Sequence, residues 1–367
     1  MIMIGLSFII YHLSTNPSGA QTVPYLPGVT PEGAVYYLPK TAIRVTVRVA
    51  RTTYTPGDFC KYAERYLRLN NVATEPSVSH EVIYISQMPV AVPDTSKVYS
   101  VKFDPKSIAA NVQLSEDGRL LAINAKNQEA DMPQPFVPAP QAAPQNPRNF
   151  LSEDILSAGS TAKMAELTAQ EIYDIRENRS LLVKGQADFM PKDGDQLRLM
   201  LNQLEQQDAA LTSLFSGTTR CDTTEHVFMV MPDRPIDHQV LFRLSQWRGL
   251  VDADDLSGTP YFISVTDLAT VPAEVNDPKS KNQDSSLNSK LQSQKSKFKG
   301  VFVNVPSRMR SIIYQGNDQV DQAEMPAPQF GHTDMLSDQL FNKRYTTQLW
   351  IDPISGAVQR LQADQPK

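Results

Sequence analysis

The stretch AIRVTVRVA at residues 42–50 decides the fold class of this chain. Apolar and polar side chains alternate along it, which is the pattern of a strand that rests one face on a hydrophobic core. An Asp-Gly turn within residues 115–118 marks a hairpin in the same third of the sequence. Further segments with strand character lie at residues 79–86, 98–103, 109–114, 119–124, 223–231, 239–244, 261–266, 300–305, 309–315 and 346–361. The chain is therefore predicted to be rich in β-strands.

Helical patterns separate the two groups of strands. Residues 162–183 and 197–214 carry apolar side chains three and four positions apart, the spacing of amphipathic helices, and Gly217 stands where a C-terminal cap belongs. A shorter helix is expected at residues 59–69. The predicted fold class is therefore α+β, with two mainly antiparallel β regions and an α-helical hairpin between them.

Composition sets the domain count and the classes of partner. At about 150 residues per domain, 367 residues suggest two domains, and 41% hydrophobic against 20% charged residues is typical of a soluble globular protein. A net charge of −5 provides no basic field for a phosphate backbone, which argues against a nucleic-acid partner. Prolines outnumber glycines by 27 to 16, which predicts extended loops and edge strands.

The predicted organisation combines these patterns with two segments of biased composition. Six prolines in the sixteen residues 132–147 favour an extended polyproline II linker. Residues 276–299 are rich in Ser, Lys, Gln and Asn and are expected to be a disordered loop. The predicted units are a signal peptide at 1–20, an N-terminal β-rich domain with one helix at 21–130, a Pro-rich linker at 131–160, the helical hairpin at 161–217 and a C-terminal β-rich domain at 218–367. Whether the two β regions share one sheet system stays open.

The N-terminus predicts export. Residues 1–13 form an apolar run, and Ser18-Gly19-Ala20 resembles the cleavage site of a secretory signal peptide. The run is too short to cross a hydrocarbon core of about 30 Å, so no transmembrane span is expected. No Lys or Arg precedes Lys40, so the usual positive segment is missing, and a short buried helix is the alternative. The predicted location is periplasmic or associated with the cell envelope.

The two cysteines, Cys60 and Cys221, carry no motif for redox or metal chemistry. In an oxidising compartment they could form a disulfide, but the favoured interpretation is two unrelated residues, one on a helix and one on a strand. The sequence also lacks H-E-x-x-H, G-x-S-x-G and a Gly-rich phosphate loop. No catalytic residue and no cofactor is therefore assigned.

A weak candidate for a metal site is the segment VDADDLSG, which contains Asp252, Asp254 and Asp255. Clustered carboxylates followed by a glycine turn can bind calcium. The twelve-residue calcium loop ends on a glutamate, however, and Ile263 occupies that position. A solvated acidic turn is the favoured interpretation.

The segment IRENR places Arg176 and Arg179 three residues apart on one side of a helix. Two like charges that close together need an acidic partner or an anion. Arg179 is also expected inside the apolar stripe, where an unpaired charge would be costly. The favoured interpretation is a salt bridge to a neighbouring element, and an interaction or anion site is the alternative.

Five segments carry a family resemblance. They are YYLPKTAIRVTVRV, FCKYAERYL, IRENRSLLVKGQADFMPKDG, LFSGTTR and LVDADDLSGTPYFI. Together they resemble a family of uncharacterised exported proteins of Bacteroidota, described as a domain of unknown function. The resemblance covers nearly the whole chain after the signal region. It implies export and a common architecture, and it implies no activity.

The first hypothesis for function is a non-enzymatic exported cell-envelope protein that binds protein partners in an assembly or scaffold role. The alternative is a glycan- or peptide-binding module that uses aromatic side chains such as Tyr36, Tyr37, Trp247 and Tyr261. A hydrolase with two carboxylates ranks last. The sequence does not specify the oligomeric state.

Overall fold

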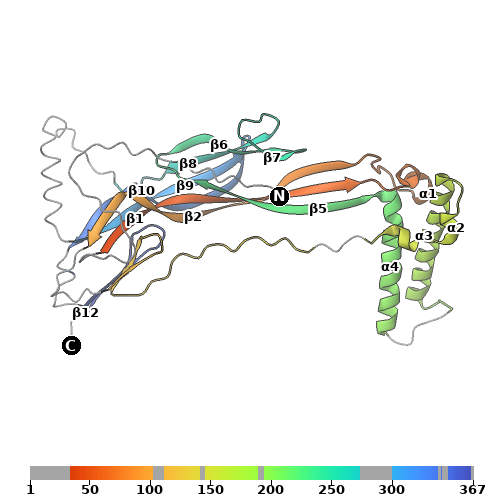
Figure 1. The fold of residues 1–367 in the computed structure, drawn as a ribbon, viewed down its shortest axis with the longest axis horizontal. Coiled ribbons are helices and arrows are strands. Elements are labelled where there is room, and N and C mark those ends of the chain that lie inside the picture. The colour runs from red at the N-terminus through yellow and green to blue at the C-terminus, as the bar shows by residue number, and fades with distance from the viewer. Residues whose placement is uncertain are drawn as a thin grey trace.

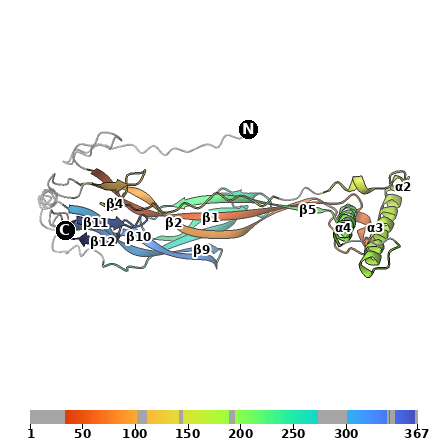
Figure 2. The same cartoon turned by 90° about the horizontal axis from the view of Figure 1, so that it is seen from below.

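The computed structural model describes residues 34–101, 111–140, 145–188, 194–272, 300–337, 340 and 346–364. The predicted signal peptide and the Lys- and Ser-rich segment at 276–299 lie outside these residues. Figure 1 shows an elongated molecule with packed β-sheets at one end and helices at the other. The view in Figure 2, turned by 90°, shows the same separation.

Strand β1 (Ala34–Thr55) is the centre of the first sheet. It pairs antiparallel with β2 (Ser77–Val101) on one side and with β5 (Thr218–Val230) on the other. Strands from both predicted β regions therefore share one sheet. The sequence predicted separate strands at 79–86 and 98–103, and this was wrong, because β2 runs unbroken through Pro89 and Pro93. As an edge strand, β2 can contain prolines without losing the ladder to β1.

A second, five-stranded sheet covers the first. It contains β6 (Ile236–Ser245), β7 (Gly249–Val251), β8 (Thr259–Asp267), β9 (Gly300–Gln315) and β10 (Asp318–Ser337), in the order β10-β9-β8-β6-β7. All its pairs are antiparallel. Strands β7 and β10 were not predicted from the sequence.

The sandwich core lies between these two sheets. The inner-facing residues of β1 are the alternating positions that the sequence pattern predicts, Ile43, Val45, Val47 and Val49. Opposite them, the Phe242 ring stacks on Tyr261 with 4.4 Å between ring centroids. The remaining fully buried members from the second sheet include Ile263, Val265, Met309, Ile313 and Met325. The prediction of an α+β fold with mainly antiparallel β regions is confirmed in part, because the structure is mostly antiparallel β-sheet and contains few helices.

A third sheet has the order β12-β11-β4-β3. It consists of β3 (Val112–Leu114), β4 (Leu120–Ile123), β11 (Thr346–Ile351) and β12 (Val358–Asp364). The terminal hairpin predicted at 346–361 is present as β11 and β12. Tyr36 and Leu38, from the first residues of β1, pack into a core with this sheet and with β9.

The helices gather at the far end of the molecule (Figure 1). The predicted helices at 162–183 and 197–214 are present as α3 (Thr161–Lys184) and α4 (Gly194–Ser216). Around them lie the short elements η1 (Cys60–Tyr62), α1 (Ala63–Leu67), η2 (Pro147–Phe150) and α2 (Glu153–Leu156). The helix predicted at 59–69 is therefore shorter than expected and begins as a 3-10 turn. This end has its own core, formed around Phe59, Ile172, Leu211, Leu214 and Phe215.

The ends of β1 and β5 carry the helices on a β arm. Beyond the sandwich, β1 and β5 stay paired up to Thr55 and Thr218. The Phe59 backbone N–H donates to the Leu214 carbonyl at 2.7 Å, which fixes the turn after β1 against α4. The Tyr54 hydroxyl donates to the Ser216 carbonyl at 3.0 Å. The arm and the helices are therefore locked together at one joint.

The Pro-rich segment connects the third sheet to the helical end without regular secondary structure over residues 126–140. It contacts the first sheet through Phe136, whose ring lies 4.2 Å from the Arg48 guanidinium carbon. Arg48 also lies 4.6 Å over the Tyr84 ring and donates to Glu225 at 3.0 Å. Phe136 therefore anchors the segment on the outer face of the first sheet.

The joint between arm and helices gives a first prediction. A Cβ atom added at Gly57 would lie 2.2 Å from the Leu214 carbonyl oxygen, a backbone atom that cannot swing aside. Gly57→Ala should lower the free energy of unfolding by about 2 kcal/mol, the cost of overpacking, measured by urea titration. Gly159→Ala is the matched control, because an added Cβ there meets nothing within 4 Å. Equal free energies of unfolding for the two variants would contradict the close contact between Gly57 and the Leu214 carbonyl.

A second prediction concerns the buried Tyr36 hydroxyl. It accepts from the Phe302 N–H at 2.8 Å and donates to the Phe302 carbonyl at 3.0 Å. Tyr36→Phe leaves both backbone groups unsatisfied and should cost about 1–3 kcal/mol of unfolding free energy at neutral pH.

The same variant has a pH signature. Burial raises the pKa of Tyr36 well above its ordinary value near 10, against the opposing effect of the hydrogen bond to Phe302. A raised pKa in the folded state contributes stability that is complete below the unfolded pKa and is lost as the pH rises above it. The stability difference between wild type and Tyr36→Phe should therefore narrow above a pH of about 10 in urea titrations. A stability difference that stays constant above this pH would contradict the raised pKa of Tyr36.

Candidate functional site

The helical hairpin contains the two arginines that the sequence singles out. Arg176 donates through Nε to both carboxylate oxygens of Asp208 on α4, each at 3.1 Å, and through Nη2 to Thr212 at 3.2 Å. The Asp208 side chain is 18% exposed, so the carboxylate faces the helix pair. Arg176 therefore joins α3 to α4.

Arg179 differs from its predicted place. It is exposed, whereas the buried stripe of α3 runs through Ile172 and Ile175 to Leu182. It has no ion-pair partner among the residues that the structure describes. The structure therefore does not bring the two guanidinium groups together at one acidic group.

The acidic turn at 252–258 is held by its own hydrogen bonds. Asp255 accepts from the Ser257 N–H at 2.9 Å and pairs with Arg248 at 2.8 Å. These interactions lower the pKa of Asp255, with the Ser257 hydrogen bonds as the largest cause. Asp252 and Asp254 are exposed. Within the described ranges, no group of three or more His, Cys, Asp or Glu side chains is arranged to bind a metal ion.

The two cysteines lie on different kinds of element. Cys60 is the first residue of η1 at the helical end, and Cys221 lies in β5, where its backbone is opposite Thr52.

No helix in the described part of the chain is long and apolar enough to cross a membrane.

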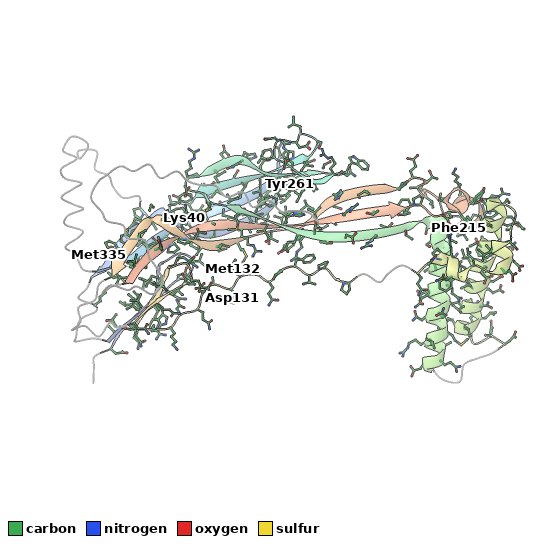
Figure 3. The ribbon with its side chains drawn as sticks, viewed as in Figure 1. Lys40, Asp131, Met132, Phe215, Tyr261 and Met335 are labelled. Carbon is green, nitrogen blue, oxygen red and sulfur yellow. The ribbon has the colours of Figure 1, made fainter. Side chains whose placement is uncertain are left out.

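The four aromatic side chains proposed from the sequence for ligand binding differ in their exposure. Tyr36 is fully buried in the core with the third sheet, and Tyr37 packs beside Gly118. Trp247 is 67% exposed in the turn between β6 and β7. Tyr261 is 4% exposed, yet it lines a small cavity at the end of the sandwich. Figure 3 shows Tyr261 in the sandwich and Phe215 in the helical end.

An apolar surface lies on the half of the hairpin that points away from the helical core. The buried residues of α4 are confined to its last turns, Ala210, Leu211, Leu214 and Phe215. Nearer the start of α4, Leu199 is 69% exposed, and at the end of α3 Val183 is 67% exposed. An open hollow of about 780 Å³ runs along this half of α4 and is lined in part by Leu197, Leu199 and Leu201. We call this surface, from Leu181 to Lys184 and from Gly194 to Leu204, the distal hairpin.

Sequence reasoning found the two helices but not the distal hairpin. The spacing of Leu197, Met200 and Leu204 predicts an apolar stripe whether or not another element covers it. Leu199 lies outside that stripe, and this position is the signal in the sequence that this half of α4 is apolar on more than one side. In the structure Leu199 is exposed.

The contact of Arg176 with Asp208 gives a third prediction. Because the Arg176 side chain is 42% exposed, we expect a coupling energy of about 0.2–1 kcal/mol in a double-mutant cycle of Arg176→Ala and Asp208→Ala, measured by urea unfolding. Arg179→Ala is the control and should leave stability unchanged. A coupling of zero, or a larger loss from Arg179→Ala, would contradict the assigned contact.

Comparison with known proteins identifies one family. A family model described as "Domain of unknown function (DUF4831)" matches residues 32–359. The match confirms the part of the predicted resemblance that concerns a domain of unknown function. Neither the curated proteins nor the solved structures contain a match to the chain.

Proposed function

The chain belongs to the DUF4831 family, and we propose that it is an exported cell-envelope protein whose distal hairpin binds a protein partner. Its role would be that of a non-enzymatic assembly or scaffold component. The observation that carries this proposal is the exposure of Val183 and Leu199 on a hairpin whose own core is already complete without them.

The energetics of the distal hairpin support a partner. Full burial of a Leu or Val side chain contributes about 1.5–3 kcal/mol, and the distal hairpin leaves several such side chains in contact with water. Leu181, Leu197 and Leu201 are half-buried in addition to the two exposed residues. Exposed apolar surface of this kind, bordered by charged side chains such as Arg198 and Glu205, is typical of a protein-binding site.

The shape of the molecule supports a bridging role. At about 3.3 Å per residue, a strand the length of β1 spans roughly 70 Å from the third sheet to the helices. The helical core contacts the arm through the joint at Gly57 and Tyr54. The distal hairpin therefore lies far from the sandwich and is free of steric competition with it (Figure 1).

Export rests on the sequence. The apolar run at residues 1–13 and the small residues at 18–20 predict a secretory signal peptide. A partner for an exported protein would be found in the cell envelope.

The fourth prediction tests the partner site. Full-length tagged protein is purified from crosslinked native envelopes and its partners are identified by mass spectrometry. Wild type should retain a stoichiometric envelope protein, and the double variant Val183→Glu and Leu199→Glu should lose it, because two buried carboxylates would oppose docking. Since both side chains are exposed, thermal unfolding of the double variant should match wild type.

The matched control is Leu256→Glu in the turn before β8. Leu256 is 83% exposed, so the same chemical change is made on an apolar side chain of the sandwich, away from the distal hairpin. This variant should retain the partner. Retention by the hairpin variant, loss by Leu256→Glu alone, or absence of any stoichiometric partner would overturn the proposal.

A further inference from the structure

The interior of the β-sandwich ends in a small cavity on the side from which the arm leaves. Its volume is about 230 Å³, below the range of roughly 300–1,000 Å³ found for drug-sized ligands. The residues around it come from β2, β6, β8, β9 and the turn after β6. Those that bear on a ligand are His80, Glu81, Gln246, Thr259, Tyr261 and Gln315.

The cavity wall changes from apolar to polar within two residues along two neighbouring strands. On β8, the inner-facing series runs from Ile263 through Tyr261 to Thr259. On β9, the next residue on the same side as the inner-facing Ile313 is Gln315, whose backbone lies opposite Tyr261 in the ladder. The sandwich therefore places an aromatic ring at the floor of the cavity and polar side chains at its mouth.

His80 is held rigidly at one wall. Its backbone N–H donates to the Gln246 carbonyl at 2.8 Å, and its Nδ1 lies 3.2 Å from the same oxygen. Gly249 has a φ of +78°, and a Cβ atom there would lie 3.1 Å from the imidazole ring. The start of β7 therefore packs directly on the imidazole, and its backbone conformation favours glycine at this contact.

Four polar groups at the mouth are uncommitted. The side chains of Gln246, Thr259 and Gln315 and the Tyr261 hydroxyl form no hydrogen bond to any residue in the described ranges. Burial raises the pKa of Tyr261, and the charge of Glu81 raises it further, so the hydroxyl keeps its proton and remains a donor. Together these groups supply both donors and acceptors around one space.

The charge of the cavity limits its ligand. No Lys or Arg is among the lining residues, and Glu81 adds a negative charge, so a phosphate or carboxylate ligand is disfavoured. Neutral hydroxyl groups match paired amide and hydroxyl side chains, because each can donate and accept. Trp247 follows Gln246 in the same turn and is 67% exposed, and it does not line the cavity.

We propose that this cavity binds one neutral sugar unit, with Gln246, Gln315, Thr259 and the Tyr261 hydroxyl as its hydrogen-bonding groups. A single sugar ring is a small ligand with hydroxyl groups around its edge and apolar C–H faces. The site lies on the sandwich, so the inference does not rest on the function proposed for the distal hairpin.

The fifth prediction tests the cavity by ligand-detected saturation-transfer NMR on the full chain. The probes are glucose, galactose, mannose and N-acetylglucosamine at millimolar concentration, each as the free sugar and as the end of a short oligosaccharide. At least one should bind wild type. Tyr261→Phe should bind it about five- to tenfold more weakly, because the ring stays in the core and only the hydroxyl is lost. Gln315→Leu should weaken binding by a similar factor.

The matched control is Tyr314→Phe, which removes a hydroxyl from the neighbouring residue on β9 that stacks on His238 and does not line the cavity. It should bind the sugar as wild type does. Thermal unfolding of all three variants establishes that each is folded. Stronger binding of the oligosaccharide identifies the end of a glycan chain as the source, and equal binding identifies the free sugar.

Three outcomes would overturn the proposal. In the first, none of the sugars binds to wild type. In the second, a sugar binds but Tyr261→Phe retains the wild-type affinity, so the sugar lies elsewhere. In the third, alkylamines bind with the same dependence on Tyr261 and displace the sugar, so Glu81 and not the neutral groups selects the ligand.

Discussion

Hydrogen-bond ladders on both sides of β1 are the constraint on which the rest of the structure depends. β1 pairs with β2 and β5 over most of its length, so its backbone cannot shift by one residue without breaking two ladders. Its side chains enter two cores in turn, first with Tyr36 and Leu38 and then with Ile43 to Val49. The turn after β1 places Phe59 in the third core, at the helical end. A one-residue slip would move every inner-facing side chain to the opposite face.

Where a long strand extends beyond its neighbour, its backbone N–H and C=O groups lose their partners in the ladder. Single side chains replace these partners at two places. β5 stops opposite Ile43, and two residues further the Gln329 amide takes the place of a strand by bonding both the N–H and the carbonyl of Thr41. The Tyr36 hydroxyl does the same for Phe302 on β9, beyond the last residue that pairs with β8. Because unsatisfied buried backbone groups are costly, these two side chains allow β1 and β9 to extend beyond their neighbours.

Sequence patterns located the elements whose periodicity reflects one buried face. The alternation at 42–50 and the spacing in α3 and α4 are local, so both could be predicted. The strands through Pro89, Pro306 and Pro326 could not, because only the sheet order shows which ladder each proline leaves intact. The cavity escaped prediction for a related reason. His80, Gln246 and Gln315 lie far apart in the sequence and carry no local motif, so only the packing of two sheets brings them together.

The length of the helices is difficult to explain by stability alone. The last residues of α4, from Ala210, are buried in the helical core and Leu204 packs against that core, whereas the segment before Leu204 extends for about 15 Å at 1.5 Å per residue. A hairpin that served only to close the end of the arm could turn back at that core and would expose neither Val183 nor Leu199. Since isolated helical turns gain little stability without tertiary packing, the extension depends on the packing of α3 and α4 against each other, which buries Leu182 but leaves Val183 and Leu199 exposed. The arm places that surface far from the sandwich (Figure 1).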